Sequence, residues 1–221
     1  MPTFTCQAIL FDQDGILVDS EITCEVNWKK WGDANGVAIE DILAVHHGRP
    51  VHQTIGLVAP HLDVPTQARA FENALAADMS ALETYPGVRE LLPRLPAHRW
   101  AMATSAPRVL AVPRLKHLGL PVPDVVVTIN DVENGKPAPD PYLLAAEKLG
   151  FEPSECLVFE DAPAGVASAK AAGATVIAVA STNPPDALRE ADLVVPELAG
   201  VQVEILQEGL VITAQGDLVD R

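Results

Sequence analysis

The feature that most constrains the fold of this chain is a short apolar run, residues 8–11, that leads directly into Asp12 and Asp14. Such a run is typical of a buried strand in a parallel sheet, and ligands bind at the carboxyl ends of such strands. Side chains alternate along a strand, so Asp12 and Asp14 project to one side, Gln13 projects to the other, and Gly15 lets the backbone leave the strand. Two carboxylates on one side repel each other unless a cation compensates, and Mg²⁺ suits such oxygen ligands. The alternative is an ordinary Asp-rich turn after a strand.

Three later segments repeat this pattern of an apolar strand that ends in polar residues. They are residues 100–105, ending in Thr104 and Ser105; residues 125–129, followed by the loop Gly135-Lys136-Pro137; and residues 157–161, ending in Glu160 and Asp161. Strands that alternate with helices form right-handed crossovers and a parallel sheet, whose carboxyl ends meet at one edge. The sequence therefore predicts an α/β fold with one polar edge.

Between the first strand and the others the chain is helical. No strand-like run interrupts residues 20–83. One helix, capped by Asp19 or Ser20, is expected to end at Gly36, and a second begins near Pro65, with apolar residues every three or four positions as far as Leu82. We therefore expect a core domain formed by residues 1–17 and 85–221 and a helical insertion formed by residues 18–84. The alternative is that the inserted helices simply extend the core.

The composition excludes some classes of partner. The 221 residues carry a net charge of −15, which argues against binding to nucleic acid or to an anionic membrane. The three cysteines have no metal-ligand spacing and are expected to be buried, reduced thiols, as in a cytoplasmic protein. No signal-peptide pattern or membrane-spanning apolar run is present in the sequence. A cytoplasmic monomer or small homo-oligomer that acts on a small metabolite is expected.

Taken in order, the four motifs resemble those of the haloacid dehalogenase-like superfamily of phosphohydrolases and phosphomutases, over about residues 9–179. The resemblance implies a Rossmann-like parallel sheet flanked by helices, with an inserted helical cap of the C1 type and a bound Mg²⁺. It makes Asp12 the nucleophile that forms an aspartyl-phosphate and also a metal ligand. It makes Asp14 the general acid and base, with its backbone carbonyl on the metal.

The remaining motif residues receive roles from the same resemblance. Asp161 is expected to bind Mg²⁺ directly and Glu160 either directly or through water, although an acidic pair at a helix N-terminus is the simpler reading. Thr104 and Ser105 are expected to hold phosphate oxygens, and both can also be ordinary helix caps. Lys136 is expected to offset the negative charge of Asp12 and phosphate, whereas an isolated loop lysine is usually solvated surface.

The substrate is predicted less sharply than the chemistry. Segments 127–132, 135–143 and 159–166 most resemble sugar- and polyol-phosphate phosphatases, including glycerol-phosphate phosphatases, with phosphoglycolate phosphatases and β-phosphoglucomutase as more distant relatives. Gly48 and Arg49 of the expected cap are candidates for gripping the substrate, or belong to a plain surface loop. The pair His46-His47 lacks a third ligand and is not assigned a metal.

Three functions remain open at this stage. The sequence favours a phosphoric monoester hydrolase that acts on a small phosphorylated sugar or polyol. The alternative is a β-phosphoglucomutase-like mutase, which the resemblance disfavours because the mutase carries a histidine where this chain has Cys24. A binding protein without turnover is the third. Residues 201–212 are expected to form a β-hairpin, to which no chemistry is assigned.

Overall fold

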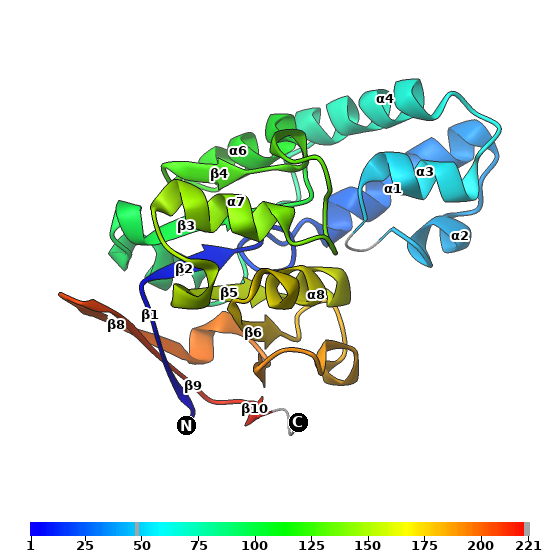
Figure 1. The fold of residues 1–221 in the computed structure, drawn as a ribbon. Helices are drawn as coiled ribbons and strands as arrows, with labels where there is room; N and C mark the ends of the chain where they lie inside the picture. The colour runs from blue at the N-terminus through cyan, green and yellow to red at the C-terminus, as the bar shows by residue number, and fades with distance from the viewer. Residues whose placement is uncertain (47–48, 219–221) are drawn as a thin grey trace.

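A computed structural model describes residues 1–46 and 49–218 (Figure 1). Its main sheet has seven strands in the order β10-β7-β6-β5-β2-β3-β4. Six of them are parallel, and β10 pairs antiparallel with β7 at one edge. In sheet order the strands are β10 (Asp217–Leu218), β7 (Leu193–Val195), β6 (Thr175–Val179), β5 (Cys156–Glu160), β2 (Ala8–Phe11), β3 (Trp100–Ala103) and β4 (Val125–Val127). The parallel α/β fold expected from the alternating strands and helices is confirmed.

Helices cover both faces of this sheet, because alternate residues of each buried strand point to opposite sides. Ala8 and Leu10 of β2 pack towards α7 (Asp140–Leu149) and α8 (Pro163–Ala172). Ile9 and Phe11 belong to the opposite cluster, which includes residues of α5 (Val88–Leu91) and α6 (Arg108–His117). Helices on both faces leave the strand ends as the accessible part of the sheet.

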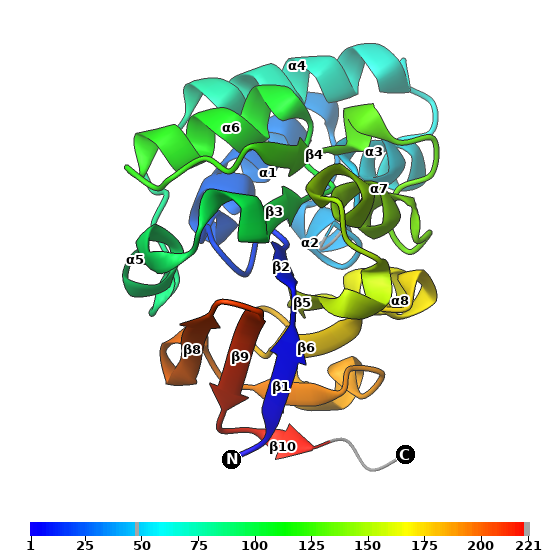
Figure 2. The same cartoon turned by 60° about the vertical axis from the view of Figure 1, so that its left-hand side comes forward.

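The expected C-terminal hairpin is present and is part of a second sheet. Strands β8 (Val201–Leu206) and β9 (Gly209–Ala214) pair antiparallel, and β9 also pairs with β1 (Thr3–Cys6), a partner that the sequence analysis did not predict. Figure 2 shows this sheet at the opposite end of the molecule from α1 and α4.

Within residues 18–46 and 49–84, the inserted segment forms four helices that share a hydrophobic cluster. These helices are α1 (Glu21–Asn35), α2 (Ile39–Leu43), α3 (Val51–Val58) and α4 (Val64–Ala77). The rings of Trp28 and Phe71 stack at 3.8 Å, and Leu110 of α6 joins this cluster from the main sheet's side. The insertion is therefore packed against the rest of the molecule through α6.

The ends of α1 and α4 agree only in part with the sequence prediction. Helix α1 ends before Gly36 as expected. Ser20 is at the N-cap position without a side-chain capping bond, whereas Asp19 Oδ1 accepts a hydrogen bond of 3.1 Å from the N–H of Glu21, the first residue of the helix. Helix α4 ends at Ala77, whereas the apolar spacing in the sequence continues as far as Leu82. The helix stops there because Asp78 takes an extended backbone conformation.

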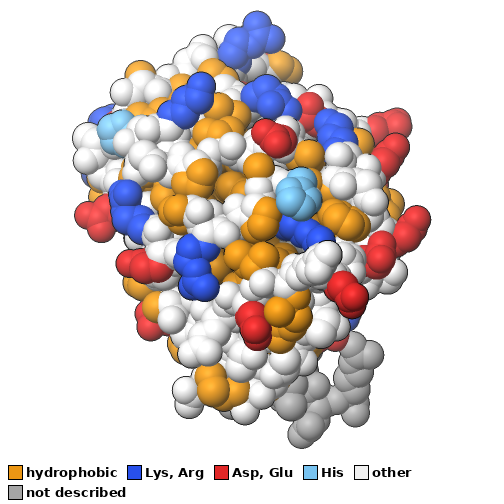
Figure 3. All heavy atoms as spheres, turned by 90° about the vertical axis from the view of Figure 1, so that its left-hand side faces the viewer, with side chains coloured by type: hydrophobic (Ala, Val, Ile, Leu, Met, Phe, Trp, Pro, Cys, Tyr) orange, Lys and Arg blue, Asp and Glu red, His pale blue; other side chains and the backbone are white. Residues whose placement is uncertain are grey.

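The face on the left of Figure 1, away from α1 to α3, is drawn in Figure 3. Apolar side chains lie there among side chains of both charges, although the net charge of the chain is −15. Within residues 1–46 and 49–218 no helix combines the length and the apolar character needed to cross a membrane.

Candidate active site

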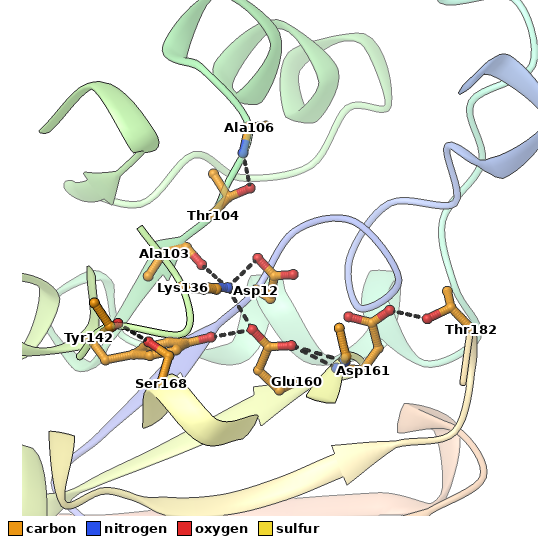
Figure 4. Close-up of polar contacts among 12 residues, drawn as sticks. Asp12, Ala103, Thr104, Ala106, Lys136, Tyr142, Glu160, Asp161, Ser168 and Thr182 are labelled. Atoms are coloured by element: carbon orange, nitrogen blue, oxygen red, sulfur yellow. Dashed lines mark hydrogen bonds and ion pairs between the residues drawn. The ribbon is translucent and has the colours of Figure 1, made fainter. Parts of the chain in front are cut away.

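The carboxyl ends of the central strands bring the predicted motifs together (Figure 4). Asp12 follows β2, Thr104 follows β3, and Glu160 and Asp161 lie at the end of β5. Carboxylate oxygens of Asp12, Glu160 and Asp161 lie within 4.8 Å of one another. Residues separated by nearly 150 positions in the sequence therefore form one acidic cluster, as expected from parallel strand order.

Lys136 lies at the centre of this cluster. Its Nζ is 2.9 Å from Asp12 Oδ1 and 2.6 Å from Glu160 Oε1, and it donates a hydrogen bond of 3.0 Å to the carbonyl of Ala103. The side chain is only 4% exposed, so it is not solvated surface. Burial alone would lower the pKa of Lys136, but the charges of Asp12 and Glu160 raise it above its usual value. Lys136 is therefore a permanent ammonium between two carboxylates.

Glu160 is held by four donors. Besides Lys136, the hydroxyl of Tyr142 donates to Oε1 at 2.7 Å, and the backbone N–H groups of Asp161 and Ala162 donate to Oε2 at 3.0 and 3.2 Å. A Cβ atom at Gly165 would lie 1.8 Å from Oε1, so only glycine allows this carboxylate against α8. Both oxygens of Glu160 therefore accept hydrogen bonds from groups of the protein.

Asp161 is positioned from the loop that follows β6. The hydroxyl of Thr182 donates to Asp161 Oδ2, and Asn183 Nδ2 donates to its carbonyl at 3.1 Å. Burial and repulsion from Glu160 raise the pKa of Asp161 above its usual value. Burial likewise raises the pKa of Asp12 to about 7, although Lys136 opposes this shift. Buried carboxylates that repel one another fit a divalent cation, because hard cations take oxygen ligands and supply the missing charge.

Asp14 lies apart from this acidic cluster. Its Oδ1 accepts hydrogen bonds of 2.6 Å from Ser20 Oγ and of 2.6 Å from Arg114 NH1. The expected contact of its backbone carbonyl with a metal stays a prediction. Its side chain is 37% exposed and lines a cavity of about 170 Å³ together with Asp12, Lys136 and Asp161.

Thr104 and Ser105 also line this cavity. Thr104 is buried, and its Oγ1 accepts a hydrogen bond of 3.0 Å from the N–H of Ala106. The N-cap of α6 is Pro107, without a side-chain bond, so neither residue caps that helix. The alternative of ordinary capping is thus wrong, and both residues line the same cavity as the acidic cluster.

The inserted helices supply the opposite wall of the cavity. Arg49 and His46 line it beside the aromatic pair Trp28 and Phe71, with Glu72 next to them. Gly48 and His47, two residues of interest in the sequence, lie outside the described residues. The cavity therefore has carboxylates and a lysine at the strand ends, and a mixture of aromatic and charged side chains on the side of the insertion.

Five residues of this arrangement were not predicted from the sequence: Ser20, Arg114, Tyr142, Thr182 and Asn183. The sequence contained a signal for Thr182 and Asn183. Residues 181–183 are polar and follow strand β6 closely, and polar residues after a strand are the pattern that marked the other motifs. Tyr142 lies in a segment that resembles the superfamily, but the resemblance gave it no role.

Comparison with known proteins places the chain in a family. The model of the haloacid dehalogenase-like hydrolases matches residues 6–173, and the chain belongs to this family. The resemblance stated from the four motifs is thereby confirmed.

Two similar curated proteins and one similar solved structure extend this finding. Hexitol phosphatase A of Escherichia coli is 40% identical over 214 residues, covering 94% of this chain and 98% of the relative. Glycerol-1-phosphate phosphohydrolase 2 of Saccharomyces cerevisiae is 34% identical over 215 residues, covering 89% of this chain and 84% of the relative. β-Phosphoglucomutase from Clostridium difficile shares the fold, with a TM-score of 0.75 at 21% identity, over 88% of this chain and 92% of that one.

Proposed function

We propose that this hydrolase is a cytoplasmic, Mg²⁺-dependent phosphatase that removes phosphate from a small phosphorylated sugar or polyol. The observation that carries the proposal is the cluster of Asp12, Lys136, Glu160 and Asp161 at the edge of a cavity. The names of the two curated relatives, a hexitol phosphatase and a glycerol-1-phosphate phosphohydrolase, support a phosphoric monoester hydrolase and this class of substrate.

The proposed reaction has two steps, both on Asp12. A carboxylate oxygen of Asp12 attacks phosphorus while the bond from phosphorus to the leaving oxygen breaks, and Asp14 gives that oxygen a proton. Asp14 then takes a proton from water as the water oxygen attacks the aspartyl-phosphate, which returns Asp12 as a carboxylate and releases inorganic phosphate. Lys136, 2.9 Å from Asp12, stabilises the charge that gathers on the phosphoryl oxygens. The hydroxyls of Thr104 and Ser105 are proposed to bind the same oxygens.

The carboxylates of Asp12 and Asp161 are the proposed direct ligands of Mg²⁺, together with the backbone carbonyl of Asp14, and Glu160 is proposed to act through water. The ion would supply positive charge beside the transferring phosphoryl group. The engaged oxygens of Glu160 support its outer position.

Residues 18–84 are proposed to act as a cap over a core formed by residues 1–17 and 85–221. Helices α1 to α4 share a hydrophobic cluster, and residues of α1, α3 and α4 line the cavity. A cap in this place would exclude water from the phosphoryl group during transfer. The aromatic side chains of Trp28 and Phe71 in this wall suit the C–H faces of a sugar or polyol, and Arg49 and Gly48 are proposed to contact the end that does not react.

The second candidate is a mutase like β-phosphoglucomutase. Arg49 favours it, because a cation in the cavity wall could hold a second phosphate. Against it, Cys24 occupies the position of the mutase histidine, and its Sγ lies 3.8 Å from Ser20 Oγ without an imidazole in that place. The phosphatase is therefore the better-supported function.

The test is release of inorganic phosphate in the presence of Mg²⁺ from a panel of phosphorylated sugars, polyols, glycolate and nucleotides. Asp12→Asn serves as the matched control, because it keeps the size of the nucleophile and removes its charge. Release from a few sugar or polyol phosphates that disappears in Asp12→Asn is the expected result. Equal release by the variant would overturn the assignment of the nucleophile. Conversion of β-glucose 1-phosphate without net phosphate release, dependent on an added bisphosphate, would establish the mutase instead.

A further inference from the structure

Arg114 is a buried arginine on a helix of the main domain. It lies on α6, is 2% exposed, and its NH1 is 2.6 Å from Asp14 Oδ1. Burying a guanidinium is costly unless a carboxylate and further hydrogen bonds compensate it. Among the described residues, Asp14 is the carboxylate with which Arg114 forms an ion pair. The buried charge of Arg114 is therefore paired with Asp14, a residue that lines the cavity.

The contacts on Asp14 are unequal between its two oxygens. Oδ1 accepts two short hydrogen bonds, one from Arg114 NH1 and one from Ser20 Oγ, each 2.6 Å long. For Oδ2, the structure gives no hydrogen bond within residues 1–46 and 49–218. Two donors on one oxygen fix the rotation of the carboxyl group, so the position of Oδ2 is fixed as well. Since Asp14 lines the cavity, Oδ2 is the oxygen available to a substrate.

Helix α6 is itself fixed against the loop that carries Asp14. Gln13 Nε2 donates a buried hydrogen bond of 2.7 Å to the carbonyl of Ala111, one turn before Arg114. Ala111 and Leu115 are fully buried on the same side of α6, and Leu110 packs into the cluster of the inserted helices. Two neighbouring residues of the loop, Gln13 and Asp14, therefore bond to residues one turn apart on α6. These bonds fix the position of Arg114 relative to the loop.

We propose that Arg114 is a positioning residue for the proton transfers of Asp14. This inference rests on the proposed function. Arg114 and Ser20 hold Oδ1, so that the proton given to the leaving oxygen departs from Oδ2, and the proton taken from water arrives there. A guanidinium remains charged in proteins and does not itself exchange a proton here, and the role assigned to it is to orient the carboxyl group. A purely structural ion pair, which would only join α6 to the loop, is the competing explanation.

The two explanations differ in how the leaving group affects the rate. A nitrophenyl phosphate releases a stable anion that departs without a proton, whereas an alkyl phosphate releases an alkoxide that needs one. The value of kcat/KM reports the first phosphoryl transfer for both substrates. We expect Arg114→Met to lower kcat/KM for the best alkyl phosphate of the panel by about 10²-fold and for p-nitrophenyl phosphate by less than about 10-fold. An equal loss on both substrates, or no loss on either, would overturn the inference.

A double-mutant cycle with Asp14→Asn provides the internal check. In the Asp14→Asn background, Arg114→Met should leave the ratio of the two kcat/KM values unchanged, because the group that it positions no longer has an acidic proton to transfer. A further change in the ratio would show that Arg114 acts on something else. Arg99→Met is the matched control: Arg99 donates to the backbone and side chain of Gln7, outside the cavity, and its loss should leave the ratio as in the wild type.

If Arg114→Met does not fold, Ser20→Ala removes the other donor to Oδ1 without burying an unpaired charge. Ser20→Ala should change the ratio of the two kcat/KM values in the same direction. Arg114→Lys keeps a cation at this position, so it should keep part of the wild-type ratio. An unchanged ratio in Ser20→Ala would then overturn the inference. The function is tested separately, because an Asp12→Asn protein that still hydrolyses either substrate would overturn the proposed phosphatase whatever Arg114 does.

Discussion

Gly15 offers a sharp test of how the backbone after β2 shapes the metal site. Its φ is +84°, in the left-handed region, and a Cβ atom there would lie 2.0 Å from Asp161 Oδ2 and 2.3 Å from Asp161 Cγ. Gly15→Ala therefore introduces two separate perturbations. The left-handed backbone costs about 1–2 kcal/mol with a side chain present. The carboxyl group of Asp161 must also move by about 1 Å, because real Cβ contacts are not shorter than 3.0 Å.

A matched glycine separates the two effects. Gly150, at the end of α7, has a φ of +81°, and a Cβ atom there would meet nothing within 4 Å in the part of the chain that the structure describes. Both Gly15→Ala and Gly150→Ala should lower Tm by about 2–8 °C, since 1 kcal/mol corresponds to about 2–4 °C in a chain of this size. Only Gly15→Ala should also lower kcat, by about 10²-fold, because an error of 1 Å in a reacting centre has an effect of that order.

The assay is phosphate release as a function of Mg²⁺ concentration, with Tm measured on the same preparations. Gly15→Ala should need more Mg²⁺ for half-maximal rate, whereas Gly150→Ala should keep the wild-type Mg²⁺ curve. If Gly15→Ala keeps the wild-type kcat and Mg²⁺ curve, the closeness of Gly15 to Asp161 does not matter for function. If both variants lose activity equally, the loss comes from general destabilisation.

Further outcomes follow from the buried charges and thiols. Lys136→Met leaves Asp12 facing a second buried carboxylate, so kcat should fall by at least about 10²-fold in steady-state assays, and near-normal turnover would contradict the role of the ammonium. Asp161→Asn should raise the Mg²⁺ needed for half-maximal rate by at least about 10-fold and change substrate KM less; the reverse pattern would remove it from the metal site. Burial raises the pKa of Cys6 and Cys156 to about 12, so the folded chain keeps protons that the unfolded chain loses above about pH 9. The free energy of unfolding in urea should therefore fall above pH 9, and a double alanine variant that shows the same fall would refute this origin.

The main motifs could be predicted because they depend on a rule of sheet geometry. Each polar group follows an apolar strand, and parallel strands end at one edge, so Asp12, Thr104 and Asp161 are expected at the same edge of the sheet. They meet there because β5, β2 and β3 are neighbours in the sheet, an order that the sequence does not show. Lys136 joins them from a loop, and only its family resemblance marked it. The pairing of β1 with β9 spans about 200 residues and leaves no local pattern, so the sequence showed the hairpin but not its third strand.

Arg114 shows where sequence reasoning stopped short and what could have taken it further. The spacing of Leu110, Ala111, Arg114 and Leu115 is that of one helix face, and three of the four positions are apolar. A charged residue on an apolar face must find a buried partner, because leaving it unpaired is costly. The helical period therefore predicts that Arg114 is paired inside the protein, but not with which carboxylate. The partner lies 100 residues away, and only the packing of α6 against the loop after β2 selects Asp14. A charge at a core position of a helix is thus a signal for a buried ion pair that strand-end motifs do not contain.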